Sequence, residues 1–445
     1  MRKWFVTLAS IVVLLTMAGA AFAGSSPLNA TSEDGILVFE SDDSAFKWWV
    51  DARVYLDAAM YMDDGPLYDP DSGDIDDYED FWETQDSLAG GAILRRARFA
   101  IKSQLWNHWY GEIDLDFADE AAAIKDAYIS YRGLFNGNGR VRIGNFRVPN
   151  GLEEVTTSRN LTFMERSLGT EPFVVGRRMG IEVTGWYPSF RWSAAVFGAD
   201  VDDFVKEANE QINFAARLNW APIATDESTL LLGVSGSMLK PTFKGAINDD
   251  GDGYAGSSVK FNTRPETNVS DTKFLYAKYS DVDNYSNFGG ELAYVNKRFM
   301  FQGEYMIANV NRYEDAGLDH IADGFNASIS HGGGYGMVSY FLTDDMRQYD
   351  HKDAEFARVT PNAKGGAWEL AARYSTADLN DTDAGEENGA ATSITLGVNY
   401  YPNANVKLML NYGKVDNDEF ATGEKGIYFG DYDFDYVQMR FQTAF

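Results

Sequence analysis

Long stretches in which apolar and polar residues alternate constrain this chain more than any other feature. Between residues 46 and 60, one face of the predicted strand carries Phe46, Trp48, Val50, Ala52, Val54, Leu56, Ala58 and Met60. The opposite face carries mainly polar side chains, among them Asp51, Arg53 and Asp57. Fifteen alternating residues exceed the ~5–6 of an ordinary globular strand. A tilted membrane strand needs ~9–11 residues and can extend into the water on either side.

The same pattern recurs to the end of the chain in roughly sixteen segments, and bacterial membrane barrels have even strand numbers. We therefore expect an all-β fold, a transmembrane antiparallel β-barrel of about sixteen strands. Aromatic residues make up 14% of the chain, which suits strands. The alternative is a soluble protein of several sheets, but an exterior so uniformly apolar would aggregate in water.

The first residues predict export from the cytoplasm. Arg2 and Lys3 are followed by an apolar run and by the small-residue pattern Ala21-Phe22-Ala23, as in a cleavable signal peptide over residues 1–23. An N-terminal membrane anchor is the alternative, although the run is short for a ~20-residue span. We expect a polar arm over residues 24–45 with a short strand at 36–39, and a barrel domain over residues 46–445.

The last ten residues alternate as well and end on a bare aromatic residue. Met439, Phe441 and Phe445 share one face, and Gln438 and Arg440 lie on the other. This stretch resembles the C-terminal strand of bacterial outer-membrane β-barrels. The resemblance implies that the strand closes the barrel in the lipid of the outer membrane. It also implies that Phe445 is part of the signal read by the barrel assembly machinery.

The formal net charge of −29 argues against nucleic acid as a partner. Most of the acidic residues fall in long Gly-containing stretches that we expect to be extracellular loops, whereas 188–189 and 402–405 predict tight periplasmic turns. The expected loops are residues 63–86, 240–272, 313–323, 348–364, 377–390 and 416–431.

Features of enzymes and cofactor sites are absent from the sequence. There are no cysteines, the four histidines stand at no metal-binding spacing, and no Gly-x-Ser-x-Gly elbow occurs. Residues 248–253 faintly resemble a calcium loop but lack its downstream Glu, so a solvated acidic turn is favoured. We expect no catalytic activity, no cofactor and no metal site.

Basic residues concentrate between positions 95 and 178 in spite of the negative total. Arg96, Arg98 and Lys102 share the polar face of one strand, and Arg140 and Arg142 share that of another. A charge on the lipid face costs ~2–4 kcal/mol at the bilayer midplane, so these side chains should face the lumen. Arg95 falls on the wrong face in this register and should lie at a strand end, beside a bulge, or reach to the interface.

Between Arg147 and Arg178 the alternation stops for about 30 residues, a length that is usually functional or disordered. This stretch could fold into the lumen and bring Arg159 and Arg166 to the pore. An ordinary surface loop is the alternative.

Several motifs carry a specific resemblance. Leu94-Arg95-Arg96-Ala97-Arg98-Phe99, Lys125-Asp126-Ala127-Tyr128 and Arg142-Ile143-Gly144-Asn145-Phe146-Arg147 are similar to the phosphate-selective porin O and P family, as are Leu161-Thr162-Phe163-Met164-Glu165-Arg166 and Trp368-Glu369-Leu370-Ala371-Ala372-Arg373. The resemblance implies a homotrimer of sixteen-stranded barrels, each with a long loop folded into the lumen. It also implies that a ladder of basic residues leads anions to a constriction. The matching positions are Arg95, Arg96, Arg98, Lys125, Arg142, Arg147 and Arg159.

We therefore expect an outer-membrane porin that passively conducts small anions, with phosphate or polyphosphate favoured. Guanidinium groups offer paired donors to phosphate oxygens, and rings of Arg or Lys select anions. The complete candidate lining is Arg95, Arg96, Arg98, Lys102, Lys125, Arg140, Arg142, Arg147, Arg159 and Arg166. A general-diffusion or cation-preferring porin is the alternative, because Asp51, Asp57, Asp114 and Asp116 share the lumen face. An adhesin or structural barrel with a plugged lumen is the third interpretation.

Overall fold

The computed structural model describes residues 28–33, 36–62, 88, 90–118, 122–199, 201, 211–241, 258–280, 282–312, 328–424 and 428–445. The predicted signal peptide, the expected loops at 63–86 and 313–323, and the acidic segment 248–253 lie outside these ranges.

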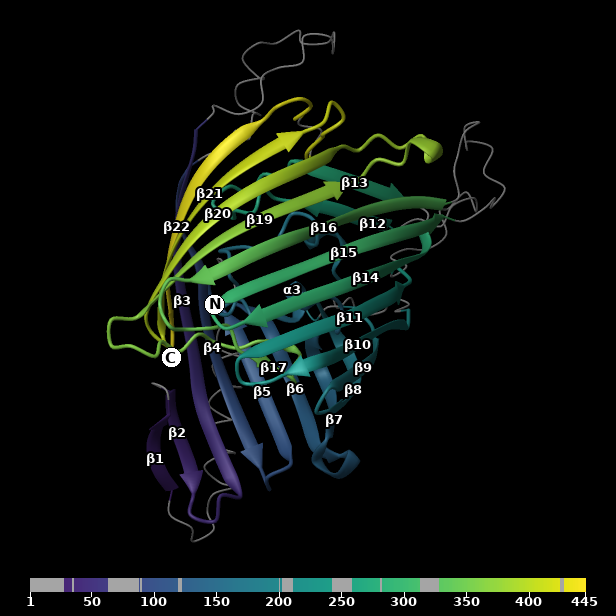
Figure 1. Cartoon of the computed structure of the whole chain (residues 1–445). Helices are drawn as coiled ribbons and strands as arrows, with labels where there is room; N and C mark the ends of the chain where they lie inside the picture. Colours follow the sequence, from purple (N-terminus) through teal and green to yellow (C-terminus); the bar gives the residue numbers. More distant parts are fainter. Residues whose placement is uncertain are drawn as a thin grey trace, which may run out of the picture.

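The chain forms one antiparallel sheet of 18 strands, sixteen of which close on themselves as a barrel (Figure 1). This confirms the predicted all-β barrel. The sixteen strands are β3 (Phe46–Tyr61), β4 (Gly91–Leu105), β5 (Trp109–Asp116), β6 (Ala123–Leu134), β7 (Gly139–Arg147), β8 (Arg177–Tyr187), β9 (Phe190–Phe197), β10 (Asn213–Ala224), β11 (Ser228–Leu239), β14 (Val282–Asn296), β15 (Phe299–Arg312), β16 (Ser328–Phe341), β19 (Ala367–Asp378), β20 (Ala390–Asn403), β21 (Val406–Asn417) and β22 (Phe434–Ala444).

The remaining elements are short. Strands β1 (Leu28–Glu33) and β2 (Ile36–Ser41) form a hairpin that pairs with the start of β3. Two further hairpins are β12 (Ser258–Thr263) with β13 (Leu275–Ser280) and β17 (Tyr349–Asp350) with β18 (Glu355–Phe356). The helical pieces are α3 (Leu152–Val155) and three 3-10 turns at Phe135–Gly137, Glu171–Phe173 and Thr382–Ala384. Among the described residues, no helix is long and apolar enough to cross a membrane.

The barrel closes where the last strand meets the first. β22 pairs with β3 from Tyr436 opposite Tyr61 to Ala444 opposite Arg53. Phe445 continues the pairing, because its N–H donates to the Ala52 oxygen at 2.9 Å and its oxygen accepts from the Ala52 N–H at 2.6 Å. Closure satisfies the backbone groups that a free sheet edge would expose to lipid.

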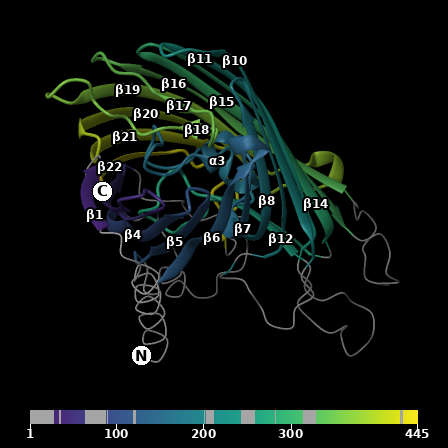
Figure 2. The same ribbon diagram turned by 90° about the horizontal axis from the view of Figure 1, so that it is seen from below.

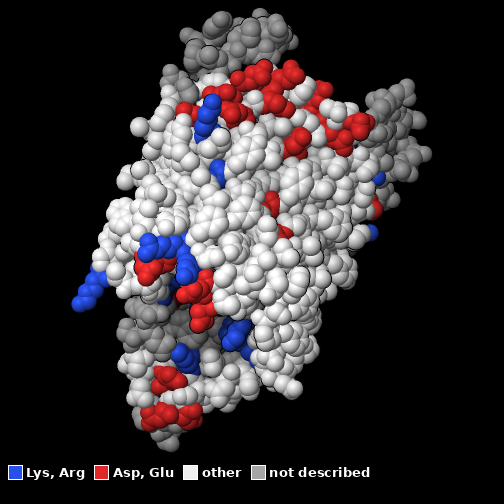
Figure 3. Space-filling view, in the orientation of Figure 1, with Lys and Arg blue, Asp and Glu red and all other residues white. Residues whose placement is uncertain are grey.

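The alternation sorts side chains between lipid and lumen as the sequence predicts. Leu56 and Met60 are 50% and 60% exposed on the outside of β3, whereas Asp51 and Arg53 are 2% and 5% exposed on the inside. On β22, Met439 points outward and Arg440 is buried. The outer surface of the wall drawn in Figure 3 is largely uncharged below a rim rich in Asp and Glu. Exposed aromatics mark the turn end of the barrel, as an interfacial girdle does; they include Trp106, Trp109, Tyr187, Phe190, Phe299, Tyr340 and Trp368.

One expected extracellular loop lies at the opposite end of the barrel. Residues 348–364 fall between the end of β16 and the start of β19, on the side of the tight turns at 188–189 and 404–405. The prediction was wrong because it rested on the length and acidity of the segment, and these features do not distinguish an extracellular loop from a segment that folds into the lumen from the turn end.

The hairpin of β12 and β13 belongs to the interior. Phe261, Phe274 and Tyr279 are buried in a cluster with Met306 of β15 and Phe434 of β22. The described part of the connection between β11 and β14, residues 258–280, therefore fills part of the lumen.

The closing contact predicts separate roles for the backbone and the ring of Phe445. We expect Phe445→Ala to retain the pairing with Ala52, because that pairing uses main-chain atoms, and to reduce delivery into the membrane by removal of the terminal aromatic ring. The measurement is the amount of heat-modifiable barrel in outer-membrane fractions, compared with refolding of the purified variant in detergent. Equal loss in both assays would assign the ring to barrel stability instead.

Candidate functional site

The segment between β7 and β8, residues 148–176, contacts inward-facing side chains from strands around the barrel. The N–H groups of Leu152 and Glu153, at the start of α3, both donate to the carboxylate of Glu304 on β15 at 2.6 Å. On the far side, the ammonium of Lys407 on β21 donates to the oxygen of Leu161 at 2.6 Å. Figure 2, which looks into the barrel, draws α3 within the ring of strands. These are the contacts expected of a loop folded into the lumen.

A second segment, residues 342–366, enters from the turn end and meets the first. Thr157 donates its N–H to Glu355 at 2.7 Å, and Asn160 donates its side-chain amide to the oxygen of Phe356 at 2.8 Å. Arg347 returns a hydrogen bond to the oxygen of Asn160 at 2.6 Å. The two segments therefore form one partition across the interior.

Four arginines, each at most 2% exposed, fix this partition by the same arrangement. Each pairs with a carboxylate and also donates to a backbone oxygen of an inner segment, so one guanidinium both neutralises a buried charge and holds a loop. Arg440 pairs with Asp57 and donates to Met164, Arg373 pairs with Glu153 and donates to Glu165, Arg217 pairs with Glu291 and donates to Ala354, and Arg347 pairs with Glu369 and donates to Asn160.

The partition leaves a polar cavity of about 240 Å³ along the inner face of β3 to β9. Nine basic and five acidic side chains line it, a local excess of positive charge in a chain of net charge −29. The basic residues are Arg53, Lys102, Arg132, Arg140, Arg142, Arg147, Arg159, Arg177 and Arg191, and the acidic ones are Glu112, Asp126, Glu182, Asp353 and Glu355.

Most of these cations are paired with carboxylates in or beside the cavity. Asp51 accepts from Arg53, Lys102 and Arg159 at 3.2, 3.1 and 3.0 Å. In the same way, Glu182 pairs with Arg142 at 2.8 Å. Two further pairs, Arg140 with Asp353 and Arg177 with Asp126, have distances of 2.7 and 2.8 Å.

Among the described residues, Arg132 and Arg191 of this lining have no carboxylate within ion-pair distance. The Arg132 guanidinium lies 3.9 Å from the ring centre of Tyr110, and Arg191 donates to the oxygen of Lys352 at 3.0 Å and to Ser193 at 3.3 Å. Both belong to the turn end of their strands. Among the described residues no carboxylate neutralises their charge at close range, so it is available to an anion in the cavity.

Two carboxylates of the inner partition differ in protonation. Burial, together with repulsion from Asp353, raises the pKa of Glu355 to about 7. Burial acts in the same direction on Asp353, but the Arg140 guanidinium outweighs it and lowers the pKa of Asp353 to about 2. The charge of Glu355 therefore changes near neutral pH.

Five of the ten sequence-predicted site residues line this cavity: Lys102, Arg140, Arg142, Arg147 and Arg159. The other five do not. Arg95 is the extra residue of a bulge opposite Tyr55 and Leu56, and it turns inward to pair with Glu165 at 2.8 Å. Arg96 lies against the ring of Tyr55.

The remaining three predicted site residues make contacts outside the cavity. Arg98 is buried between Asp114 and Asp116, with N–O distances of 3.6 and 2.9 Å. Arg166 pairs with Glu154 and donates to oxygens of the inner segment. Lys125 lies at a bulge of β6 and its oxygen accepts from Asn145.

Four lining residues were not among the predicted site residues: Arg53, Arg132, Arg177 and Arg191. The alternation places Arg53 on the lumen face, which was the available signal. Arg191 is the second residue of β9, directly after a tight turn. So short a stretch of alternation does not indicate which segment of the interior lies opposite its side chain. Its place in the cavity follows from segment 342–366, whose Lys352 accepts a hydrogen bond from Arg191 through its backbone oxygen.

Glu112, Asp114 and Asp126 bring carboxylate oxygens within 4.8 Å of one another, a spacing that a cation could use. Lys102 lies 3.3 Å from Glu112, and Arg177 holds both oxygens of Asp126 at 3.2 and 2.8 Å. Two of the three carboxylates thus already pair with cationic side chains, and we assign this group to the ion-pair network.

A closed barrel with an apolar exterior and a charged cavity inside it is the architecture of an outer-membrane porin. We call this cavity along the inner face of β3 to β9 the passage. The fold and the site thus indicate a channel rather than an enzyme. A family model described as phosphate-selective porin O and P matches residues 71–445. The chain belongs to this family.

Individual relatives agree with this assignment. Porin O of Pseudomonas aeruginosa is 25% identical over 480 aligned residues, which cover 100% of both chains. An uncharacterised protein of Caulobacter vibrioides is 26% identical over 422 residues, 91% of this chain and 76% of the relative.

Solved structures share the fold at low sequence identity. An anion-selective porin from Comamonas acidovorans superposes with a TM-score of 0.51 at 13% identity, covering 90% of this chain and 100% of its own. OmpT of Vibrio cholerae in its trimer form gives 0.51 at 11% identity over 90% of this chain and 100% of its own.

The anchoring of α3 generates a prediction about the width of the passage. Glu304→Ala removes the acceptor of two buried N–H groups, which costs about 2–4 kcal/mol of anchoring. We expect a larger and noisier single-channel conductance in planar bilayers, because the inner segment becomes free to move. Ile307→Ala, on the lipid face of the same strand, is the matched control and should conduct as the wild type does. An unchanged trace for Glu304→Ala would mean that the other contacts suffice.

Proposed function

We propose that this protein passively conducts small anions across the outer membrane, with phosphate or polyphosphate favoured. The observation that carries the proposal is the lining of the narrow cavity, in which nine cations face five carboxylates. Rings of Arg and Lys are a known means of selecting anions. No catalytic step is part of this function.

The order of the cations along the wall supports transfer from site to site. Arg147 and Arg177 stand at the loop end of β7 and β8, Arg142 in between, and Arg132 and Arg191 at the turn end. An entering anion can exchange with a carboxylate at each pair, so that no site holds it tightly. Several moderate sites conduct better than a single strong one.

The names of relatives point the same way. The family is described as phosphate-selective, and one structural neighbour is described as anion-selective. By the same analogy we propose a homotrimer, since a neighbour has a trimer form, and insertion by the barrel assembly machinery. Export through a cleaved signal peptide at 1–23 and the arm at 24–45 remain predictions from the sequence.

A cation-preferring or general-diffusion porin is the second candidate, favoured by the carboxylates of the lumen. Asp57, Asp114 and Asp116, however, all lie beside arginines and do not line the cavity. The carboxylates that line it are fewer than the cations. The balance of charge therefore favours anions.

The test is the reversal potential of the purified protein in a planar bilayer under a KCl gradient, repeated with phosphate. We expect an anion-selective reversal and block of chloride current by phosphate. Arg132→Ala and Arg191→Ala should each weaken the block about tenfold, which corresponds to losing one charge-assisted hydrogen bond of about 1.5 kcal/mol.

Arg298→Ala is the matched control, because this arginine pairs with the exposed Asp344 away from the cavity. It should leave both quantities unchanged. A cation-selective reversal that ignores phosphate would contradict the proposal and support the second candidate.

The protonation of Glu355 predicts that selectivity depends on pH. Its pKa of about 7 means that the carboxyl is neutral at pH 6 and charged at pH 8, where it faces Asp353, Arg147 and Arg159. We expect the anion-to-cation permeability ratio to fall roughly two- to fivefold from pH 6 to pH 8, for about 0.5–1 kcal/mol per unit charge across an aqueous passage. Glu355→Gln should hold the pH 6 ratio throughout, and an identical pH profile in this variant would refute the assignment.

A further inference from the structure

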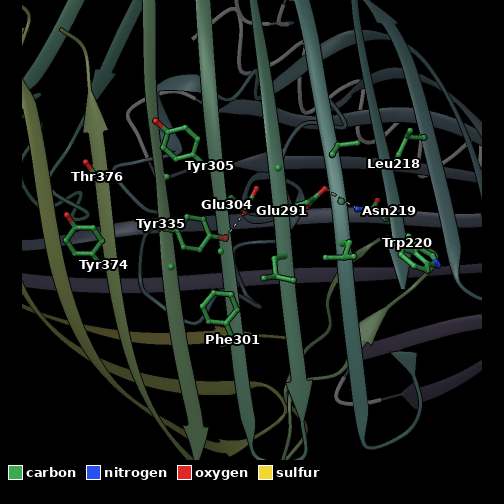
Figure 4. Close-up of a pocket in the computed structure, with 18 of the residues that line it drawn as sticks. Leu218, Asn219, Trp220, Glu291, Phe301, Glu304, Tyr305, Tyr335, Tyr374 and Thr376 are labelled. Carbon is green, nitrogen blue, oxygen red and sulfur yellow. Dashed lines mark hydrogen bonds between the residues drawn. The ribbon is translucent and has the colours of Figure 1, made fainter. Parts of the chain in front are cut away.

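A hollow on the lipid-facing side of the barrel has no counterpart in the function above. It has a cavity volume of about 700 Å³ and lies over β10, β11, β14, β15, β16 and β19 (Figure 4). Two adjacent rows of outward positions form its floor. One row aligns Gly290, Tyr305 and Gly334, and the next aligns Gly303, Gly336 and Tyr374.

In the part of the chain that the structure describes, no contact requires glycine at Gly290 or Gly336. A Cβ added at either position would meet no atom within 4 Å, and neither has a positive φ. Glycine in the interior of a strand weakens it, and it often marks a place where something approaches the backbone closely. At these two positions no described residue makes that approach, which leaves the space open to a group from outside the chain.

The chemistry of the hollow is that of a hydrocarbon site. In Figure 4, Tyr305, Tyr374 and Phe301 surround it, whereas Glu304 and Glu291 are engaged with Tyr335 and Asn219. Both carboxylates are buried on the inner face of the wall. The outward groups therefore offer apolar surface and a few hydroxyls, with no charge to bind a headgroup or an acidic partner.

The depth of the hollow in the membrane indicates which lipid leaflet it faces. Phe301, Gly303 and Tyr305 are the third, fifth and seventh residues of β15 counted from its turn end. The turn end is the periplasmic side of such barrels. This half of the wall faces the inner leaflet, which in the outer membrane consists of phospholipid.

We propose that the hollow is a binding groove for one acyl chain of a phospholipid. Because bulk lipid is equally apolar, the preference comes from shape and van der Waals packing against the bare glycine backbone rather than from the hydrophobic effect. The aromatic side chains at its edge keep the chain in place. The inference does not depend on which ion the pore conducts.

The double variant Gly290→Leu with Gly336→Leu tests the groove by filling it. Wild type and variants are reconstituted in vesicles of phosphatidylethanolamine and phosphatidylglycerol, extracted in mild detergent and weighed by native mass spectrometry. We expect one phospholipid per wild-type chain to persist, and its occupancy to fall about fivefold in the double variant, because the leucines replace the packing contacts of the acyl chain. Ala194→Leu, which adds one leucine to the exposed outer face of β9 outside the hollow, should retain lipid as the wild type does.

A second readout locates the bound chain and checks the fold. A phosphatidylethanolamine with a photoreactive group in its acyl chain should label peptides containing Phe301, Tyr305 or Tyr374 in the wild type. Heat modifiability on gels establishes that each variant is a closed barrel. The proposal would be overturned if folded wild type and double variant retained equal amounts of phospholipid, or if the double variant changed the number of protomers. It would also be overturned if wild-type protein extracted directly from cell membranes retained lipid A and no phospholipid.

Discussion

The pairing of inward arginines with carboxylates is the interaction on which the rest of the interior depends. A barrel in lipid confines charged side chains to its inner face. A buried ion left unpaired costs several kcal/mol. Arg440 and Arg347 meet this requirement with both oxygens of Asp57 and Glu369. Their remaining N–H groups donate to backbone oxygens of segment 148–176. The pairs that neutralise buried charge inside the barrel therefore also hold the partition in place.

Arginine–carboxylate pairs serve two purposes in this barrel, and the pairs that serve them differ in their exposure to water. The side chain of Arg440 is 1% exposed beside Asp57, and such a dry pair is expensive to separate. In the passage, the side chains of Arg142 and Arg159 are 13% and 22% exposed. Water lowers the energy of these pairs, so an arriving anion can compete for the guanidinium. Dry pairs therefore hold the partition in place, whereas the pairs of Arg142 and Arg159 at the cavity are open to exchange.

The period of two in the sequence predicted the barrel, its strand number and the face of nearly every charged residue that was considered. It could not predict the position of a residue along the pore or what covers it. Arg98 and Lys102 share one face of β4, yet only Lys102 lines the cavity, because Asp114 and Asp116 on the neighbouring strand enclose Arg98. Residues 348–364 were assigned to the wrong end because their length and acidity are those of an extracellular loop, although they fold inward from the turn end. Contacts between segments far apart in sequence decide these outcomes, and no local pattern encodes them.

The acidic balance of the chain and the basic passage are compatible because they act over different distances. The acidic residues gather at the loop end, as the rim in Figure 3 shows, whereas the cations lie within the barrel. At physiological salt, charges farther apart than about 8 Å are largely screened. The rim thus affects how often an anion reaches the mouth, and the lining decides which ion crosses. Selectivity measured at high salt therefore reports the charges of the lining. At low salt the acidic rim also repels anions, and this repulsion lowers only the rate at which anions are captured at the mouth.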